Sequence, residues 1–168
     1  MNPSGQVPTI QFANGAVLYE SGLILEVIDQ IYESSTPSLF PKDPIANAQL
    51  KLKIRSLTKF IPLYYGVARM QDDWEQKADT LKSELIKLEA ELGDQTFFGG
   101  DRLSALDLMI FPHLERTLWM RETHLKSNYE LIGGENLKTL RAYYERVREL
   151  EHLKRAFAER RAHLSIIA

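Results

Sequence analysis

Glu20 and Ser21 are the residues of this sequence whose types and position point most directly to binding chemistry. They stand between an apolar run, Ala16–Tyr19, and a segment with apolar residues at helical spacing. Ser21 is predicted to be the N-cap of that helix, where its hydroxyl and the free N–H groups of the first turn can hold a carboxylate. The Glu20 carboxylate can hold an ammonium group. The pair would suit the zwitterionic end of an amino acid, although a simple helix cap is the alternative.

A β-hairpin is predicted to position this pair. Apolar runs at Thr9–Phe12 and Ala16–Tyr19 flank Ala13-Asn14-Gly15. Asn-Gly between apolar runs is a strong hairpin signal, because both residues tolerate positive φ. The helix that follows is expected to end near Glu33, and a polar linker, residues 34–43, comes next. The predicted organisation is therefore an α+β segment over residues 1–33, the linker, and a helical region over 44–168.

The region after the linker is predicted to be entirely helical. A long helix from about Pro44 to Met70 is expected to kink or break at Pro62. The next, from about Trp74 to Leu92, has apolar residues at alternating four- and three-residue steps, which is typical of a neighbour in an antiparallel bundle. A coiled coil is the alternative, but the run is short. Two later helices are expected, one capped by Asn136 with Leu137, Leu140, Tyr144 and Val147 on one stripe, and one near Glu151–Arg161.

Ser104 and Asp107 give the clearest helix start in the chain. Their S-x-x-D spacing is a capping box, in which the side chain of each residue accepts a hydrogen bond from the backbone N–H group of the other. We interpret both residues as structural rather than catalytic. The helix that they begin is apolar nearly all round, and His113 and Arg116 interrupt it one turn apart. A lone histidine on such a face is more often a core residue than a functional one.

Composition narrows the classes of function. The chain has 168 residues, 44% of them hydrophobic, with a net charge of −2, so nothing favours nucleic acid or an anionic membrane as a partner. It contains no cysteine, which removes disulfides, thiolate metal sites and thiol nucleophiles from these residues. The histidines show no metal-ligand spacing, so we predict no metal. The sequence shows no apolar run long enough to cross a bilayer, so a cytoplasmic protein is predicted.

Several motifs, in order, resemble glutathione transferases. V-P-T-I, the hairpin, then Y-E-S and an apolar helix are similar to the second half of the glutathione-binding domain of that family. The opening N-P-S-G-Q-V-P, the later F-P-K-D-P, and F-F-G-G-D-R-L-S-A-L-D look most like the omega class. The resemblance implies a mostly α fold. A partial thioredoxin-like segment, residues 1–33, would precede an all-helical glutathione-transferase C-terminal domain, residues 44–168.

The resemblance also implies roles for particular residues. Val7 would pair its backbone with the cysteinyl part of glutathione, with Pro8 in a cis peptide bond, and Glu20 and Ser21 would hold the γ-glutamyl end. Phe111, His113 and Arg116 would lie near the pocket for a small electrophilic or oxidised co-substrate. The family has an opening strand–helix–strand unit before the segment that matches residue 2, and the omega-class cysteine lies in it. We therefore expect a fragment, a truncated gene model or a natural short form.

Two functions follow as hypotheses. The first is an omega-type glutathione transferase, with glutathione as co-substrate for thiol transfer and dehydroascorbate reduction. This chain would keep the glutathione-binding half of the site but would be inactive alone. Such an enzyme would be expected in detoxification and could form a homodimer. The alternative is a non-catalytic binding or interaction module of glutathione-transferase type, with an unpaired hairpin edge.

Overall fold

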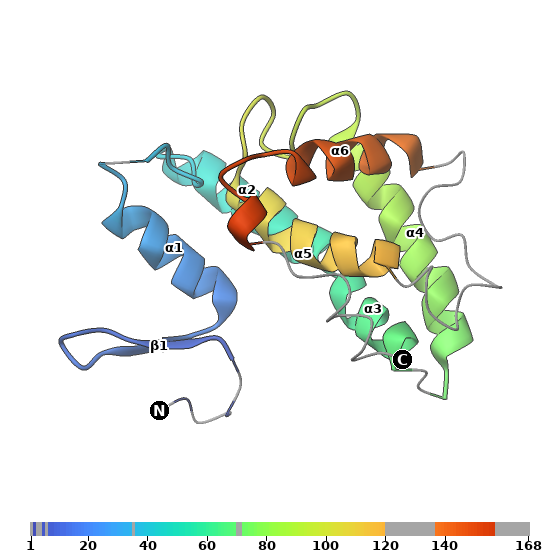
Figure 1. Cartoon of the computed structure of the whole chain (residues 1–168), viewed down its shortest axis with the longest axis horizontal. Helices are drawn as coiled ribbons and strands as arrows, with labels where there is room; N and C mark the ends of the chain where they lie inside the picture. The colour runs from blue at the N-terminus through green and yellow to red at the C-terminus, as the bar shows by residue number, and fades with distance from the viewer. Residues whose placement is uncertain are drawn as a thin grey trace. The chain divides into compact units, whose positions relative to one another are not determined.

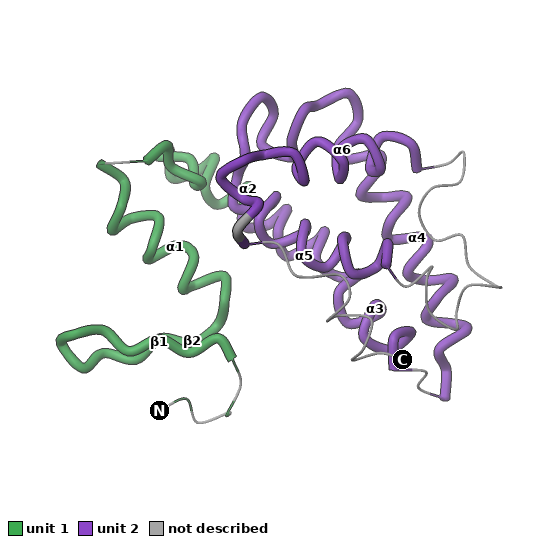
Figure 2. The backbone as a smooth tube through the Cα atoms, viewed as in Figure 1, with its two compact units in different colours: residues 1–50 green, residues 51–168 purple. Residues whose placement is uncertain are grey.

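Helices dominate the computed structural model, which describes residues 2, 5, 7–34, 36–69, 72–119 and 137–156 (Figure 1). The chain divides into two units, residues 1–50 and 51–168 (Figure 2). The first holds a two-stranded antiparallel sheet, and the second is built from helices. The predicted fold class, mostly α with a hairpin-and-helix segment at the start, is confirmed. The proposed linker at 34–43 stays a prediction.

Unit 1 begins with the hairpin. Strand β1, Thr9–Gln11, pairs with β2, Val17–Tyr19, with Ile10 opposite Leu18 at the centre. The turn is longer than a two-residue Asn-Gly turn: Phe12 N–H donates to Ala16 O at 2.9 Å, which leaves residues 13–15 as the loop. Only Gly15 of these three has positive φ, at 85°. This is the three-residue hairpin loop that ends in a left-handed glycine.

Helix α1, Ser21–Ile31, follows β2 directly and carries two contrasting faces. Ile24 is buried on one face, and Asp29 is buried on the other. The Asp29 carboxylate accepts hydrogen bonds from the Ser38 hydroxyl at 2.6 Å and from the Leu39 N–H at 2.8 Å. A buried carboxylate that accepts two such bonds is satisfied, so Asp29 fastens the segment after α1 to the helix.

The predicted long helix is broken into two. Helix α2 is Pro44–Leu57 and α3 is Phe60–Ala68, so α2 spans the division between the units. Pro44 is the first residue of α2, as predicted, and Asp43 accepts from the Ala46 N–H at 2.8 Å. Pro62 cannot donate to the carbonyl four residues earlier. The break therefore falls just before α3, which places Pro62 in a first turn where no N–H is needed.

Unit 2 is organised around α4, Trp74–Leu92, and α5, Ala105–Trp119. The predicted seam of α4 is confirmed, because five of its apolar side chains are completely buried: Ala78, Leu81, Leu85, Leu88 and Leu92. Helix α4 packs against α3 and α6, and α5 packs against the same two helices. Leu106, Ile110 and Leu114 of α5 are also completely buried. These helices therefore form a bundle core of the kind that the heptad-like spacing indicated.

Helix α6, Lys138–Arg148, is capped from another helix. The Glu89 carboxylate on α4 accepts from the Thr139 N–H at 2.9 Å and the Leu140 N–H at 2.7 Å. The cap predicted for this helix was Asn136, which lies outside the described residues. A carboxylate at the positive end of a helix satisfies its orphan N–H groups. A contact across 50 positions thus does what a local cap would have done.

Two further predictions for the C-terminal region need correction. The predicted apolar stripe included Tyr144, but Tyr143 is the completely buried tyrosine and Tyr144 is only half-buried. Tyr143 is drawn inward because its hydroxyl donates to Asp107 Oδ1 at 3.1 Å. The final helix, predicted near Glu151–Arg161, is a turn over residues 151–153 and a 3-10 helix at Lys154–Ala156, and its predicted residues 157–161 lie outside the described residues. Among the residues that the structure describes, no helix is long and apolar enough to cross a membrane.

Asp107 accepts four hydrogen bonds from the described residues of unit 2. It is completely buried, and its Oδ2 accepts from both the N–H and the hydroxyl of Ser104, each at 2.8 Å. Its Oδ1 accepts from the Phe98 N–H at 2.9 Å and from Tyr143. The carboxylate therefore ties the start of α5 to the preceding loop and to α6. Figure 2 shows α5 and α6 in unit 2. The Ser104 hydroxyl donates its hydrogen bond to Asp107.

Candidate functional site

The junction between β2 and α1 presents Glu20 and Ser21 to solvent. Both residues are exposed. Glu20, not Ser21 as predicted, is the N-cap of α1, because its carbonyl accepts the first helical bond, from the Ile24 N–H at 3.0 Å. Ser21 is the first helical residue, and the N-cap side chain makes no capping hydrogen bond. The N–H groups of the first turn therefore remain available to an anion.

Glu20 has an unusual backbone conformation. Its φ is 72° and its ψ is 110°, and among the described non-glycine residues it alone has positive φ. For a residue with a Cβ such a conformation costs on the order of 1–3 kcal/mol, and residues of this kind cluster at functional sites. The turn from strand into helix at this point is what forces the conformation. It also turns the Glu20 side chain outward rather than into a cap.

The hairpin register brings the four predicted glutathione-binding residues to one end. Thr9 is paired with Tyr19, so the next residues beyond this pair are Pro8 on one strand and Glu20 on the other. The Val7–Pro8 bond is cis, as predicted. Val7 is 89% exposed, so its backbone is accessible in this structure. Val7, Pro8, Glu20 and Ser21 thus lie in unit 1 at the end of the hairpin that adjoins α1.

Of the three residues predicted for the co-substrate pocket, Phe111 lies apart from His113 and Arg116. Phe111 is buried and stacks on Tyr144 at 5.8 Å between ring centroids, and it also contacts Tyr143 edge to face. His113 is two positions further along α5, about 200° around the helix. Its ring contacts Phe60 at 6.4 Å and Tyr65 at 6.0 Å. Phe111 is therefore a core residue between α5 and α6, whereas His113 faces α3.

His113 is held neutral by its surroundings. Burial, and then the positive charge of Arg116, lower the pKa of His113 from 6.5 to about 4. Its Nδ1 atom is buried and has no hydrogen-bond partner within the described part of the chain. Burial also raises the pKa of Tyr64 on α3 to about 12, although Arg116 opposes that change. At neutral pH the His113 imidazole is therefore uncharged, and it cannot serve as a proton donor of pKa near 7.

The sequence did not reveal the contacts of α3 that reach His113 through Tyr65. Tyr64 and Tyr65 contact each other edge to face at 5.0 Å, and the Arg69 guanidinium lies 5.3 Å from the centre of the Tyr65 ring. Tyr65 comes from a helix more than 40 positions before His113, so no local spacing links it to α5. Among the described residues, no group of three or more histidine, cysteine, aspartate or glutamate side chains could hold a metal ion.

Comparison with known proteins agrees with this architecture. Residues 71–146 match the family described as "Glutathione S-transferase, C-terminal domain". Omega-1 glutathione S-transferase of Sus scrofa is 34% identical over 119 residues, which are 68% of this chain and 48% of that protein. The probable glutathione S-transferase MSR-1 of Nicotiana plumbaginifolia is 30% identical, over 78% of this chain and 59% of that protein.

Solved structures show the same fold. Glutathione transferase Omega 3C from Trametes versicolor has a TM-score of 0.73 at 21% identity, covering 94% of this chain and 70% of that one. Rice GST1, solved in complex with glutathione, has a TM-score of 0.75 at 21% identity, covering 96% of this chain and 74% of that one. The fold and the matched helical domain define a glutathione-transferase-like protein. Residues 71–146 match the glutathione S-transferase C-terminal domain, and the chain spans about half the length of the mammalian omega glutathione S-transferases to which it is similar.

Proposed function

We propose that this chain supplies the glutathione-binding residues of an omega-type glutathione transferase. The observation that carries the proposal is the hairpin register, which sets Val7-Pro8 and Glu20-Ser21 at one end of unit 1. Glu20 would bind the ammonium group of the γ-glutamyl end. Ser21 and the first-turn N–H groups of α1 would bind its carboxylate, and the Val7 backbone would pair with the cysteinyl part. The positive φ of Glu20 supports a functional role for this junction.

The co-substrate would contact His113 and Arg116 of α5 and the nearby rings of α3, all in unit 2. A small electrophilic or oxidised molecule would find a neutral imidazole, the cationic Arg116 and the aromatic rings of α3 there. Thiol transfer and dehydroascorbate reduction would need a thiol nucleophile, and these 168 residues contain no cysteine. We therefore expect negligible dehydroascorbate reductase activity from this polypeptide alone. A cytoplasmic location, homodimer formation and a role in detoxification belong to the same proposal.

Isothermal titration calorimetry with glutathione tests the half-site. Glu20→Ala and Ser21→Ala should each weaken binding about tenfold or more, because each removes a hydrogen bond to a charged group. Glu75→Ala and Ser83→Ala are matched controls, since both residues are exposed on α4 in unit 2. These controls should bind like the unsubstituted chain. Absence of binding in the folded chain, or equal losses in the control variants, would contradict the proposal.

Glu20→Gly separates binding from folding. Glycine adopts positive φ without a Cβ penalty, so this variant should be more stable than Glu20→Ala by about 1 kcal/mol. It should still lose the ammonium contact and bind glutathione as weakly as Glu20→Ala does. Thermal unfolding followed by far-UV circular dichroism gives the first comparison, and calorimetry gives the second. A Glu20→Gly chain that retains full affinity would show that the Glu20 carboxylate takes no part.

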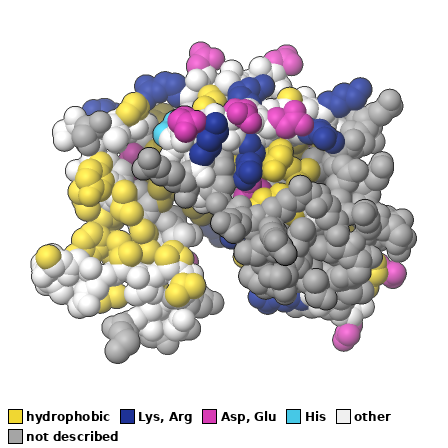
Figure 3. All heavy atoms as spheres, viewed as in Figure 1, with side chains coloured by type: hydrophobic (Ala, Val, Ile, Leu, Met, Phe, Trp, Pro, Cys, Tyr) yellow, Lys and Arg dark blue, Asp and Glu magenta, His cyan; other side chains and the backbone are white. Residues whose placement is uncertain are grey.

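A non-catalytic interaction module is the second candidate, and exposed apolar side chains favour it. Figure 3 shows apolar side chains gathered over the hairpin and α1. Val7, Leu23, Ile31 and Tyr32 are each more than half exposed. Apolar surface of this kind marks interaction sites. Sedimentation of the purified chain with and without glutathione would distinguish the candidates, because a module would self-associate or bind a protein while ignoring glutathione.

A further inference from the structure

One aromatic ring links two arginines where α3 contacts α5 in unit 2. Arg69 is the C-cap of α3, and its guanidinium carbon lies 5.3 Å from the centre of the Tyr65 ring. The same ring contacts that of His113 on α5, with 6.0 Å between the centroids. Arg116 follows His113 by three positions, so the two share a face of α5. Tyr65 thus has one arginine over its ring and a second one turn beyond the histidine that it contacts.

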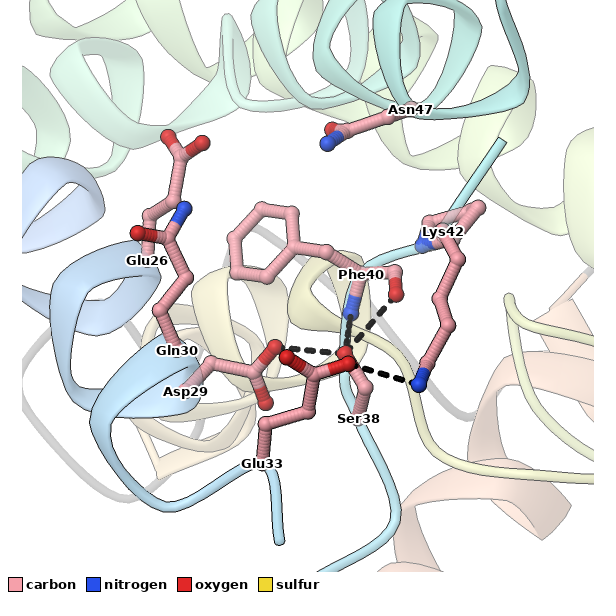
Figure 4. A pocket seen from close by; sticks show the side chains of 9 residues that line it. Glu26, Asp29, Gln30, Glu33, Ser38, Phe40, Lys42 and Asn47 are labelled. Carbon is pink, nitrogen blue, oxygen red and sulfur yellow. Dashed lines mark hydrogen bonds and ion pairs between the residues drawn. The ribbon is translucent and has the colours of Figure 1, made fainter. Parts of the chain in front are cut away.

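Arg69 and Arg116 form no ion pair within the described ranges of the chain. Glu115, the neighbour of Arg116 in sequence, is 3% exposed and is paired with Arg148 of α6 at 2.6 Å. Its carboxylate is therefore committed to another cation. Figure 4 shows the contrast in unit 1, where Lys42 in the lining of a polar cavity is paired with a glutamate.

The two positive charges act on the same part of α3. Burial raises the pKa of Tyr64 to about 12, and the charges of Arg116 and Arg69 both oppose that rise. Like charges that lack a counter-ion repel one another, and an anion placed near both relieves the repulsion. A guanidinium group can donate two parallel hydrogen bonds to an oxyanion such as a carboxylate. This pair of charges therefore favours an acidic ligand.

The side chains of α3 also favour an aromatic ligand. Tyr65 is 36% exposed, and Arg69 is exposed as well. The cation–π contact holds the Arg69 guanidinium against the ring, so less side-chain freedom is lost when a ligand binds. The ring offers an apolar surface beside the charge, which favours a ligand whose acid group adjoins an aromatic body.

We infer that Arg69 and Arg116 select a co-substrate of the aromatic carboxylate or sulfonate class. The acid group accepts hydrogen bonds from the guanidinium groups, and the aromatic body packs on the exposed part of Tyr65. This inference deepens the co-substrate contact of the proposed function and rests on it. It adds Arg69 and Tyr65 to that contact as specificity-determining residues.

Calorimetric titration of the full chain with naphthalene-2-sulfonate tests the inference, with naphthalene-2-sulfonamide as the neutral probe of similar shape. At low ionic strength the sulfonate should bind at least about fivefold more tightly than the sulfonamide. Arg69→Gln and Arg116→Gln should each weaken sulfonate binding about three- to tenfold and leave sulfonamide binding unchanged, because each removes one charged donor. Arg69→Lys should lose less than Arg69→Gln, because lysine keeps the charge but not the planar pair of donors. Circular dichroism confirms that each variant is folded.

Arg141→Gln is the matched control, since it removes a guanidinium group from the exposed side of α6, where Arg141 pairs with Glu145 at 3.1 Å. It should leave the binding of both probes unchanged. Equal weakening of sulfonate binding in Arg141→Gln and Arg116→Gln would reduce the effect to general charge attraction and overturn the inference. Equal affinity for the two probes, or absence of sulfonate binding, would also overturn it.

Tyr65→Leu separates failure of the inference from failure of the proposed function. It removes the ring and no charge, so it should weaken the binding of both probes by about threefold or more. If both probes bound equally and Tyr65→Leu weakened both, the co-substrate contact would stand and the selection of an anion would fall. If neither probe bound, both would fall. Glutathione binding by unit 1 is measured in its own titration, because all of these residues lie in unit 2.

Discussion

Asp107→Ala should be among the most destabilising single substitutions in unit 2. The substitution removes a completely buried carboxylate that accepts four hydrogen bonds at 2.8–3.1 Å. The Ser104 hydroxyl can turn to another acceptor, but the N–H groups of Phe98 and Ser104 and the Tyr143 hydroxyl are left buried. Each unsatisfied buried donor costs about 1–3 kcal/mol. Partial relaxation reduces the total, so we expect a loss of about 3–5 kcal/mol.

This loss is a large part of an ordinary folding free energy of about 5–15 kcal/mol. In a chain of this size it corresponds to a fall in melting temperature of roughly 10–15 °C. Urea unfolding followed by tryptophan fluorescence is the suitable assay, because both tryptophans, Trp74 and Trp119, lie in unit 2. The signal then reports on the unit that contains Asp107 and not on the hairpin.

Matched variants separate the hydrogen bonds from the charge. Asp107→Asn keeps one acceptor oxygen but points an amide N–H₂ at donors, so its stability should lie between those of the unsubstituted chain and Asp107→Ala. Tyr143→Phe removes one donor and should cost about 1 kcal/mol. Asp79→Ala, at an exposed position of α4, should change stability by less than about 0.5 kcal/mol. If Asp107→Ala were as stable as Asp79→Ala, the buried carboxylate could not be the tie between the loop, α5 and α6.

Two further predictions concern unit 2. His113 is neutral in the folded chain with a pKa of about 4, below its ordinary 6.5, so protonation favours unfolding and stability should fall as pH drops from 6.5 to 4. The difference between the two pKa values corresponds to a loss of up to about 3 kcal/mol in the free energy of unfolding. The variant His113→Gln should lose less stability on acidification, as measured by urea unfolding at pH 7, 5.5 and 4. Parallel pH curves for both chains would contradict it. Glu89→Ala should lower the free energy of unfolding by about 1–3 kcal/mol, because two N–H groups at the start of α6 lose their acceptor. The control Glu91→Ala breaks only the half-exposed pair with Lys53 and should lower it by less than about 1 kcal/mol. Equal losses in the two variants would refute the capping role of Glu89.

The local pattern was sufficient for several elements. The hairpin followed from the Asn14-Gly15 signal, and the buried seam of α4 followed from its apolar spacing. The break before α3 followed from Pro62. Each of these depends on residues within one or two turns of one another, where side-chain direction is fixed by the period of the element. The identity of the N-cap was missed, because the positive φ of Glu20 comes from how β2 enters α1.

Other features could be decided only by the packing of distant segments. The family resemblance grouped Phe111 with His113, but the helix turns the two rings toward different neighbours, α6 and α3. The cap of α6 comes from Glu89, about 50 positions earlier, and no local motif encodes it. By itself the sequence determined the hairpin, the buried face of α4 and the break before α3, because those choices are made by neighbours along the chain. The tertiary structure decided which distant donor meets which acceptor, because hydrogen bonds and ring contacts depend on distances that the order of residues does not contain.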